Sequence, residues 1–80
     1  MILQKTKNNR TFQAYKEIGI TRNVIIEVFE LIKFKTPFGY EVTNHKFILS
    51  KGTNLNFNET NENNANLIYE AEKLLSEVKE

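Results

Sequence analysis

The C-terminal stretch, NANLIYEAEKLLSEVKE, has one apolar side and therefore constrains what the rest of the chain can do. Its aliphatic residues recur at the spacing of an α-helix, which predicts a helix over 67–80. Asn63 or Asn64 is suited to cap it, and Lys79 lies in the last turn, where its charge suits the helix dipole. Either the rest of the same chain or a second copy of the helix must cover the stripe. The stripe consists of Leu67, Ile68, Ala71, Leu74, Leu75 and Val78.

The composition argues against catalysis and against metal binding. The 80 residues include no cysteine, aspartate or tryptophan, and His45 is the only histidine. A nucleophile, base and acid would have to come from Ser, Lys, Glu and this one His, and no spacing suggests such a set. One histidine with scattered glutamates does not make a metal site. We therefore expect a protein that is not an enzyme and needs no cofactor.

The chain shows no sign of export or membrane insertion. Its beginning, MILQKTKNN, lacks an apolar segment of secretory length, and no apolar run approaches the roughly 20 residues of a membrane span. The absence of cysteine indicates a reducing compartment. These features predict a cytoplasmic protein without a membrane partner, and the length predicts one small domain.

Charge and composition divide this domain, residues 1–80, into three parts. Residues 1–51 carry nine Lys and Arg against four Glu, whereas residues 52–80 carry two Lys against six Glu. The basic body suggests a polyanionic partner, and the acidic end either solvates a helix or faces the basic part. Residues 52–66 contain seven asparagines and predict a loop between the body and the helix at 67–80.

The run QAYKEIGITRNVIIEVF, residues 13–29, decides the fold of the body. At about 100° per residue, most apolar side chains of residues 21–35 gather on one arc, which indicates a helix. The β-branched run Val24-Ile25-Ile26 favours a strand instead. We expect the helix, because burial of an amphipathic face usually outweighs propensity.

The flanking segments extend this interpretation. Thr11 is suited to cap a short helix that Gly19 ends in the left-handed conformation, and Thr21 to cap the second helix. Aromatic and β-branched residues around Thr43-Asn44 predict a hairpin over residues 38–50. Residues 1–7, MILQKTK, are suited to a third strand.

Two short helices about a glycine resemble the helix-turn-helix of DNA-binding proteins, and the hairpin resembles the wing of a winged helix. The resemblance implies an α+β fold, a small winged helix-turn-helix-like domain with a C-terminal amphipathic helix. It also implies a small DNA-binding transcriptional regulator of the kind that phages and mobile elements carry. The residues that match the helix-turn-helix pattern are Ala14, Ile18, Gly19, Ile20, Ile25 and Val28.

On this interpretation, Thr21, Arg22 and Asn23 begin the recognition helix and reach base edges. Arginine can pair with guanine, and asparagine with adenine, through two hydrogen bonds each. The alternative is that Thr21 only caps the helix and that the other two side chains are solvated. A second group would contact phosphates from the helix end and the wing, with a solvated surface as the alternative for each. This group consists of Lys33, Lys35, Asn44, His45 and Lys46.

A second fold remains open. If residues 11–18 and 24–35 are strands, the chain is a β-meander closed by one C-terminal helix. It would then act as a protein-binding inhibitor or adaptor that blocks a surface of a host protein. Phe12, Tyr15 and Tyr40 would be its interface anchors. With either fold, the C-terminal helix offers a surface for a homodimer.

Overall fold

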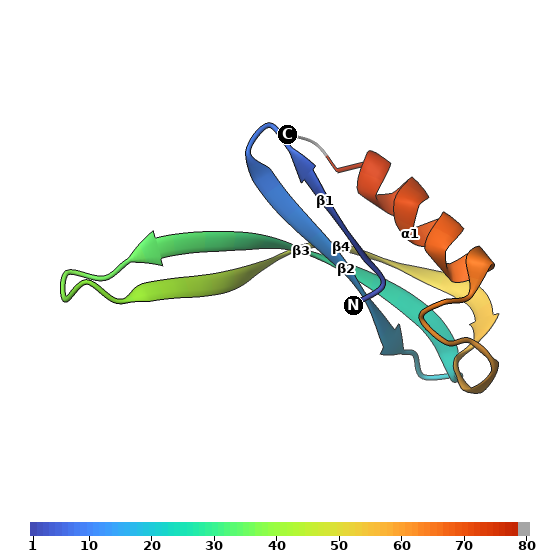
Figure 1. Cartoon of the computed structure of the whole chain (residues 1–80). Coiled ribbons are helices and arrows are strands. Elements are labelled where there is room, and N and C mark those ends of the chain that lie inside the picture. Colours follow the sequence, from blue (N-terminus) through green and yellow to red (C-terminus); the bar gives the residue numbers. More distant parts are fainter. Residues whose placement is uncertain (79–80) are drawn as a thin grey trace.

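The strands of this protein form one antiparallel sheet, and a helix lies across one of its faces (Figure 1). A computed structural model describes residues 1–78. The sheet order is β1-β2-β3-β4, so each strand pairs with its neighbours in sequence. The elements are β1 (Leu3–Lys7), β2 (Arg10–Ile18), β3 (Asn23–Lys35), β4 (Glu41–Asn56), the 3₁₀ turn η1 (Phe57–Glu59) and α1 (Ala65–Ser76).

The predicted winged helix-turn-helix fold is wrong, and the β-meander alternative is correct. Residues 11–18 and 24–35, which the first interpretation made helical, belong to β2 and β3. In β3, Val24, Ile26 and Val28 are fully buried under α1, while the residues between them are half-buried on the other face. Both faces of β3 carry apolar residues. Plotted at the angle of an α-helix, these residues also fall on one broad arc, which is why the pattern fitted a helix. The β-branched propensity was the better guide.

Gly19 lies in the turn between β2 and β3, not between two helices. The Arg22 N–H donates to the Gly19 carbonyl over 3.1 Å, and Arg22, not Gly19, has the positive φ, of 62°. A Cβ on Gly19 would lie 2.3 Å from Oδ1 of Asn23. Glycine is therefore required here for a close approach of side chain to backbone, and not for the left-handed conformation that was predicted.

The predicted hairpin at residues 38–50 is misplaced, because β4 runs without a turn through Thr43 and Asn44. The turn instead spans Thr36 to Tyr40, where the Thr36 N–H donates to the Tyr40 carbonyl over 2.8 Å. Pro37 cannot donate to a ladder, and Gly39 takes a φ of 87°, so these two residues fix the turn. The first five residues of the predicted loop at 52–66 belong to β4, and the predicted N-terminal strand is confirmed as β1.

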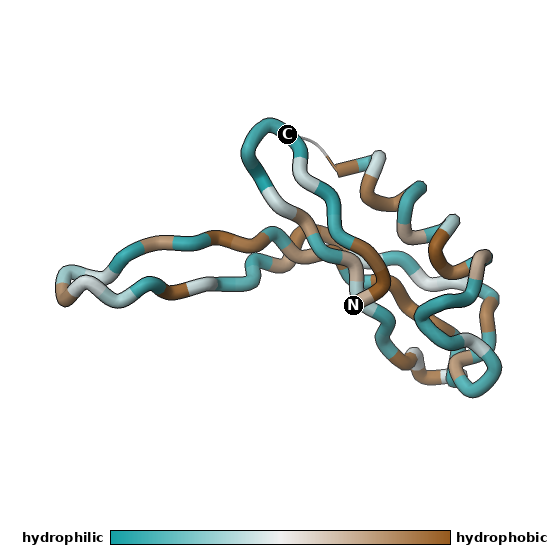
Figure 2. The backbone as a smooth tube through the Cα atoms, viewed as in Figure 1, coloured by the Kyte–Doolittle hydropathy of each residue, from teal (hydrophilic) through white to brown (hydrophobic). Residues whose placement is uncertain are grey.

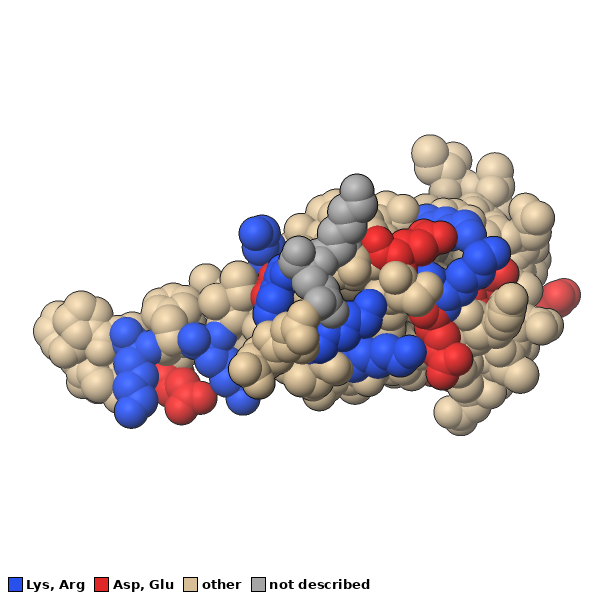
Figure 3. All heavy atoms as spheres, turned by 90° about the horizontal axis from the view of Figure 1, so that it is seen from above, with Lys and Arg blue, Asp and Glu red and all other residues tan. Residues whose placement is uncertain are grey.

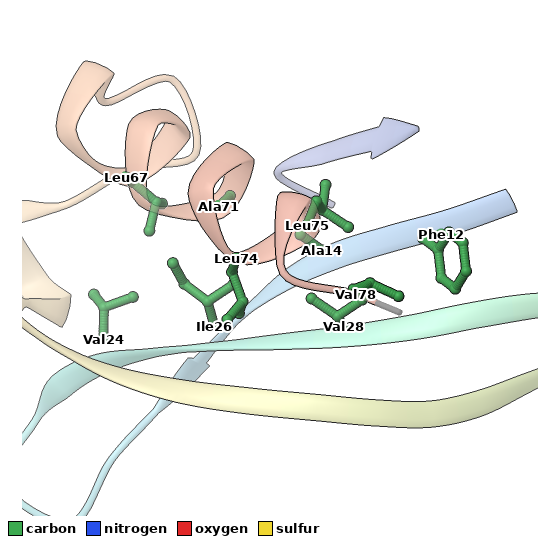
Figure 4. Packing of buried hydrophobic residues seen from close by; sticks show 10 residues of the cluster. All are labelled: Phe12, Ala14, Val24, Ile26, Val28, Leu67, Ala71, Leu74, Leu75 and Val78. Atoms are coloured by element: carbon green, nitrogen blue, oxygen red, sulfur yellow. The ribbon is translucent and has the colours of Figure 1, made fainter. Parts of the chain in front are cut away.

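The predicted C-terminal helix is confirmed, but it runs from Ala65 to Ser76 and not over 67–80, since Glu77 forms its C-cap. Asn64 caps its start, and the Asn64 side chain accepts from the Asn66 and Leu67 N–H groups. Residues 79 and 80, including Lys79, lie outside the described part. Apart from Ile68, the apolar stripe packs on the chain's own sheet (Figure 4), so the same chain covers it, which is the first of the two alternatives considered above. The core consists of Phe12, Ala14, Val24, Ile26, Val28, Leu67, Ala71, Leu74, Leu75 and Val78.

The two longest strands extend far beyond the helix. β2 pairs with β3 only as far as Leu31, so the rest of β3 pairs with β4 alone. We call residues 32–44 the β-arm; it is the two-stranded projection on the left of Figure 1. Apolar and polar residues alternate along it (Figure 2), and it lengthens the molecule to 45 Å against 23 and 19 Å in the other directions. We call the sheet face under α1 the helix face, and the opposite face the open face.

The division into a packed body and a projecting arm predicts unequal effects of truncation. Ile26→Ala or Leu75→Ala should lower the free energy of unfolding by about 2–5 kcal/mol, because each leaves a cavity between α1 and the sheet. Phe34→Ala in the β-arm should cost under about 0.5 kcal/mol. Urea unfolding followed by circular dichroism measures all three. A cost for Phe34→Ala equal to that of the core variants would show that the arm is packed.

Candidate functional site

The residues predicted to contact DNA lie in two places at opposite ends of β3. Thr21, Arg22 and Asn23 are in or next to the β2–β3 turn, and the other five lie on the β-arm or at its base. From Asn23 to Lys35, an extended strand rising by about 3.3 Å per residue covers roughly 40 Å. The structure therefore does not bring the eight residues together in one interface.

Two of the three side chains at the turn, those of Thr21 and Asn23, have a structural role, whereas Arg22 is exposed. The Thr21 hydroxyl donates to Asn23 Oδ1 over 2.9 Å, and Asn23 Nδ2 donates to the Thr53 carbonyl over 3.2 Å. The Thr53 hydroxyl in turn donates to the Val24 carbonyl over 2.8 Å. These bonds fasten the turn to β4. Thr21 is thus not a helix cap, and Asn23 is occupied within the fold.

The β-arm separates the remaining five residues onto two faces, because side chains alternate along a strand. Lys33 and Lys35 are on the open face, opposite Thr43 and Glu41 of β4, and His45 lies opposite Leu31 on the same face. Asn44 and Lys46 belong to the helix face. Figure 3 shows acidic and basic side chains side by side on the arm. The arm therefore has mixed charge rather than a continuous basic surface.

The helix face of the β-arm is apolar and uncovered. Ile32 and Phe34 continue the row of buried β3 residues past the end of α1, and Val42 lies opposite Phe34. Ile32 is 39% exposed and Phe34 44% exposed. At the tip, Phe38 is 86% and Tyr40 72% exposed. Exposed aromatic side chains in this number are typical of contact surfaces.

An ion pair closes the covered part of the helix face where the β-arm begins. Arg10 donates from Nε to Glu30 Oε2 over 2.9 Å and from Nη2 to Glu30 Oε1 over 2.8 Å, and its guanidinium lies 5.0 Å from the centre of the Phe12 ring. Glu30 is only 8% exposed. The hydrogen bond from Arg10 and its positive charge hold the pKa of Glu30 below its usual range, against the opposing effect of burial.

A row of aromatic rings crosses the open face from β2 to β4. The rings of Tyr15 and Phe29 lie 5.7 Å apart, edge to face, and those of Phe29 and Phe47 lie 5.8 Å apart in the same manner. A β-bulge at Ile48 places Phe47 on the open face and Leu49 on the helix face, although they are two residues apart. The row forms only when β2, β3 and β4 pair in this register. The helical interpretation of residues 21–35 excluded that pairing, so Phe29 and Phe47 were not identified from the sequence as surface residues.

The three anchors proposed for the β-meander differ in their exposure. Tyr15 is half-buried in the aromatic row, and Tyr40 is exposed at the tip of the β-arm. Phe12 is fully buried under α1 and belongs to the core. Even-numbered residues of β2 face α1 and odd-numbered residues face away from it, so Phe12 is buried whereas Tyr15 lies on the open face.

Comparison with protein-family models, curated proteins and solved structures found no match. Within residues 1–78, no cluster of three or more His or Glu side chains is arranged to hold a metal ion. The same residues contain no helix that is both long and apolar enough to cross a bilayer. The β-arm and the open face are the two exposed surfaces of the described chain with apolar and aromatic side chains.

The Arg10–Glu30 pair predicts a contribution to acid sensitivity. Because the folded pKa of Glu30 is lowered, the unfolded chain binds more protons below the usual glutamate pKa of about 4.3, and stability falls as the pH drops through the folded pKa. Glu30→Gln has no such titration, so its unfolding free energy should fall less between neutral pH and about pH 3. Chemical unfolding at several pH values, with the exposed Glu72→Gln as control, measures this. Equal pH slopes for Glu30→Gln and the unaltered protein would contradict it.

Proposed function

We propose that this protein is a non-catalytic binding module that attaches to a partner protein through its β-arm. The observation that carries the proposal is the apolar helix face of the arm. There, Ile32 and Phe34 continue the row of buried β3 residues past the end of α1, where no other part of the described chain covers them. Phe38 and Tyr40 add two exposed rings at the tip. Aromatic residues are enriched in protein interfaces, and tyrosine is one of the residue types most often found among the few that dominate the binding energy.

The exposed area of the arm is of the right order for such a contact. A buried aromatic side chain contributes about 150–250 Å², so the exposed fractions of Phe34, Phe38 and Tyr40 correspond to roughly 400 Å². A stable interface buries about 800 Å² on each partner. The three rings thus provide about half of that area, and the strand edges and polar residues beside them can supply the rest.

The construction of the arm also favours binding. Its two strands are joined by a cross-strand ladder and continue into the packed sheet, so the backbone that carries its exposed rings is anchored in the sheet. An isolated two-stranded ribbon is marginally stable in water, so cover from a partner would stabilise the arm. A projecting ribbon of this shape fits a groove, and filling a groove blocks it. This supports an inhibitor or adaptor role.

Nucleic-acid binding is a second candidate, supported by one observation. Lys33 and Lys35 lie on the open face of the β-arm, and His45 lies on the same face at the base of the arm. Two-stranded ribbons of this kind can enter a DNA groove. Phe38 at the tip is of the type that can wedge between base steps. Glu41 lies opposite Lys35, however, and two lysines provide few phosphate contacts. The apolar face makes a protein the better-supported partner.

Site-specific crosslinking tests the proposal. A photoreactive phenylalanine analogue replacing Phe38 should give a discrete crosslinked protein in the cells that encode the chain. The same analogue replacing Ile20, which is fully exposed in the β2–β3 turn, should not give that product. With the crosslinked protein purified, the double variant Phe38→Ala, Tyr40→Ala should bind it at least about tenfold more weakly than the unaltered chain. Ile20→Ala should bind normally.

Two results would contradict the proposal. One is equal affinity of the unaltered chain and the double tip variant for the crosslinked protein. The other is a gel shift of duplex DNA that weakens steeply between low and moderate salt and is lost in Lys33→Ala, Lys35→Ala, which would favour the second candidate.

A further inference from the structure

The open face has a small depression beside the aromatic row, on the opposite side of the sheet from α1. Its volume is about 290 Å³, and its lining includes Tyr15, Glu17, Glu27, Phe29 and His45. This volume is at the lower limit of small-molecule sites, which suits one side chain better than a larger ligand. It is also distinct from the apolar helix face of the β-arm.

Two aromatic rings form fixed walls of this depression. The Tyr15 and Phe29 ring planes meet at 76°, and the Tyr15 hydroxyl donates to Gln13 Oε1, which holds the ring in place. Phe47 packs against the other side of Phe29. The face of an aromatic ring carries partial negative charge and attracts a cation.

Two carboxylates add full negative charge to the same depression. Glu27 lies opposite Tyr15 on the neighbouring strand, and Glu17 follows Tyr15 on the same face of β2. Within residues 1–78, no ion-pair or hydrogen-bond partner contacts the Glu27 carboxylate, and the Glu17 carboxylate accepts only a long bond from the Ile18 N–H. These charges are thus not neutralised within the fold.

The nearest lysine does not compensate them. Lys16 contributes to the lining, but its side chain is directed to the helix face of the sheet. Its Nζ donates to the Thr60 carbonyl over 2.7 Å and lies 4.5 Å from the centre of the Phe57 ring. The depression is therefore anionic and aromatic.

We infer that this depression binds a guanidinium group. A guanidinium is planar and weakly hydrated, so it stacks on a ring and donates two parallel hydrogen bonds to a carboxylate, whereas an ammonium ion acts as a point charge. The combination of rings and carboxylates matches both properties. The assignment of this group to an arginine side chain of the partner protein rests on the proposed function, but the affinity for guanidinium does not.

Titration of the isotope-labelled full chain with N-acetyl-arginine amide, followed by nuclear magnetic resonance, tests the inference. The Tyr15 and Phe29 ring resonances should shift in a saturable manner. The citrulline analogue, of the same shape but uncharged, should cause no saturable shift. The double variant Glu17→Gln, Glu27→Gln should bind about three- to tenfold more weakly, whereas Glu72→Gln on the exposed side of α1 should bind normally.

Three outcomes would overturn the inference: no saturable shift with the arginine amide, equal binding of the citrulline analogue, or equal binding of N-acetyl-lysine amide. The glutamine substitutions preserve side-chain shape on exposed or half-exposed positions, so the fold should persist, and the dispersion of the amide resonances verifies it. The titration uses no partner protein. Its failure would leave the role of the β-arm standing, and failure of the crosslinking experiment would leave the guanidinium site standing.

Discussion

The packing of α1 on one face of β2 and β3 is the contact on which the rest of this structure depends. A helix of 12 residues is about 18 Å long at 1.5 Å per residue. β3 has 13 residues and, at about 3.3 Å per residue, spans roughly 40 Å. The helix therefore covers only the part of β3 from Val24 to Val28, and it leaves the β-arm and the whole open face uncovered. The uncovered β-arm follows from this mismatch in length, whereas the open face is uncovered because α1 packs on only one face of the sheet.

The Arg10–Glu30 ion pair marks the border between the covered and uncovered parts. It closes the core above Phe12, yet the apolar alternation of β3 resumes beyond it with Ile32 and Phe34. A strand that only faced water there would be expected to carry charged residues that discourage association. On the open face, the aromatic row joins β2, β3 and β4 through edge-to-face contacts and so contributes to the sheet. The two glutamates beside it have no ion-pair partner within residues 1–78. These features support the two binding surfaces that we propose.

The sequence predicted the elements that depend on local pattern and missed those that depend on pairing. The stripe from Leu67 to Val78 and the Asn64 cap were sufficient to predict α1, because a single face of that helix is apolar. The pattern of residues 21–35 fitted a helix and a strand, because Ile25, Phe29 and Leu31 pack across strands on the open face. The Arg10–Glu30 pair, 20 residues apart, and the bulge that turns Phe47 outward become visible only when the strand register is known. Of the residues predicted to bind DNA, the strand register places Lys33, Lys35 and His45 on the same face of the sheet. It places Asn44 and Lys46 on the opposite face, and the other three residues lie in or next to the β2–β3 turn.

Residue-by-residue amide hydrogen exchange of the free chain reports how well each part of β3 is covered. We expect slow exchange for the hydrogen-bonded amides of residues 24–28 of β3 and 67–75 of α1. Exchange should be at least about a hundredfold faster for the hydrogen-bonded amides of the β-arm, which opens without disrupting the core. Equal protection along the whole of β3 would mean that the free chain already covers the arm, and it would rule out an arm left uncovered by α1.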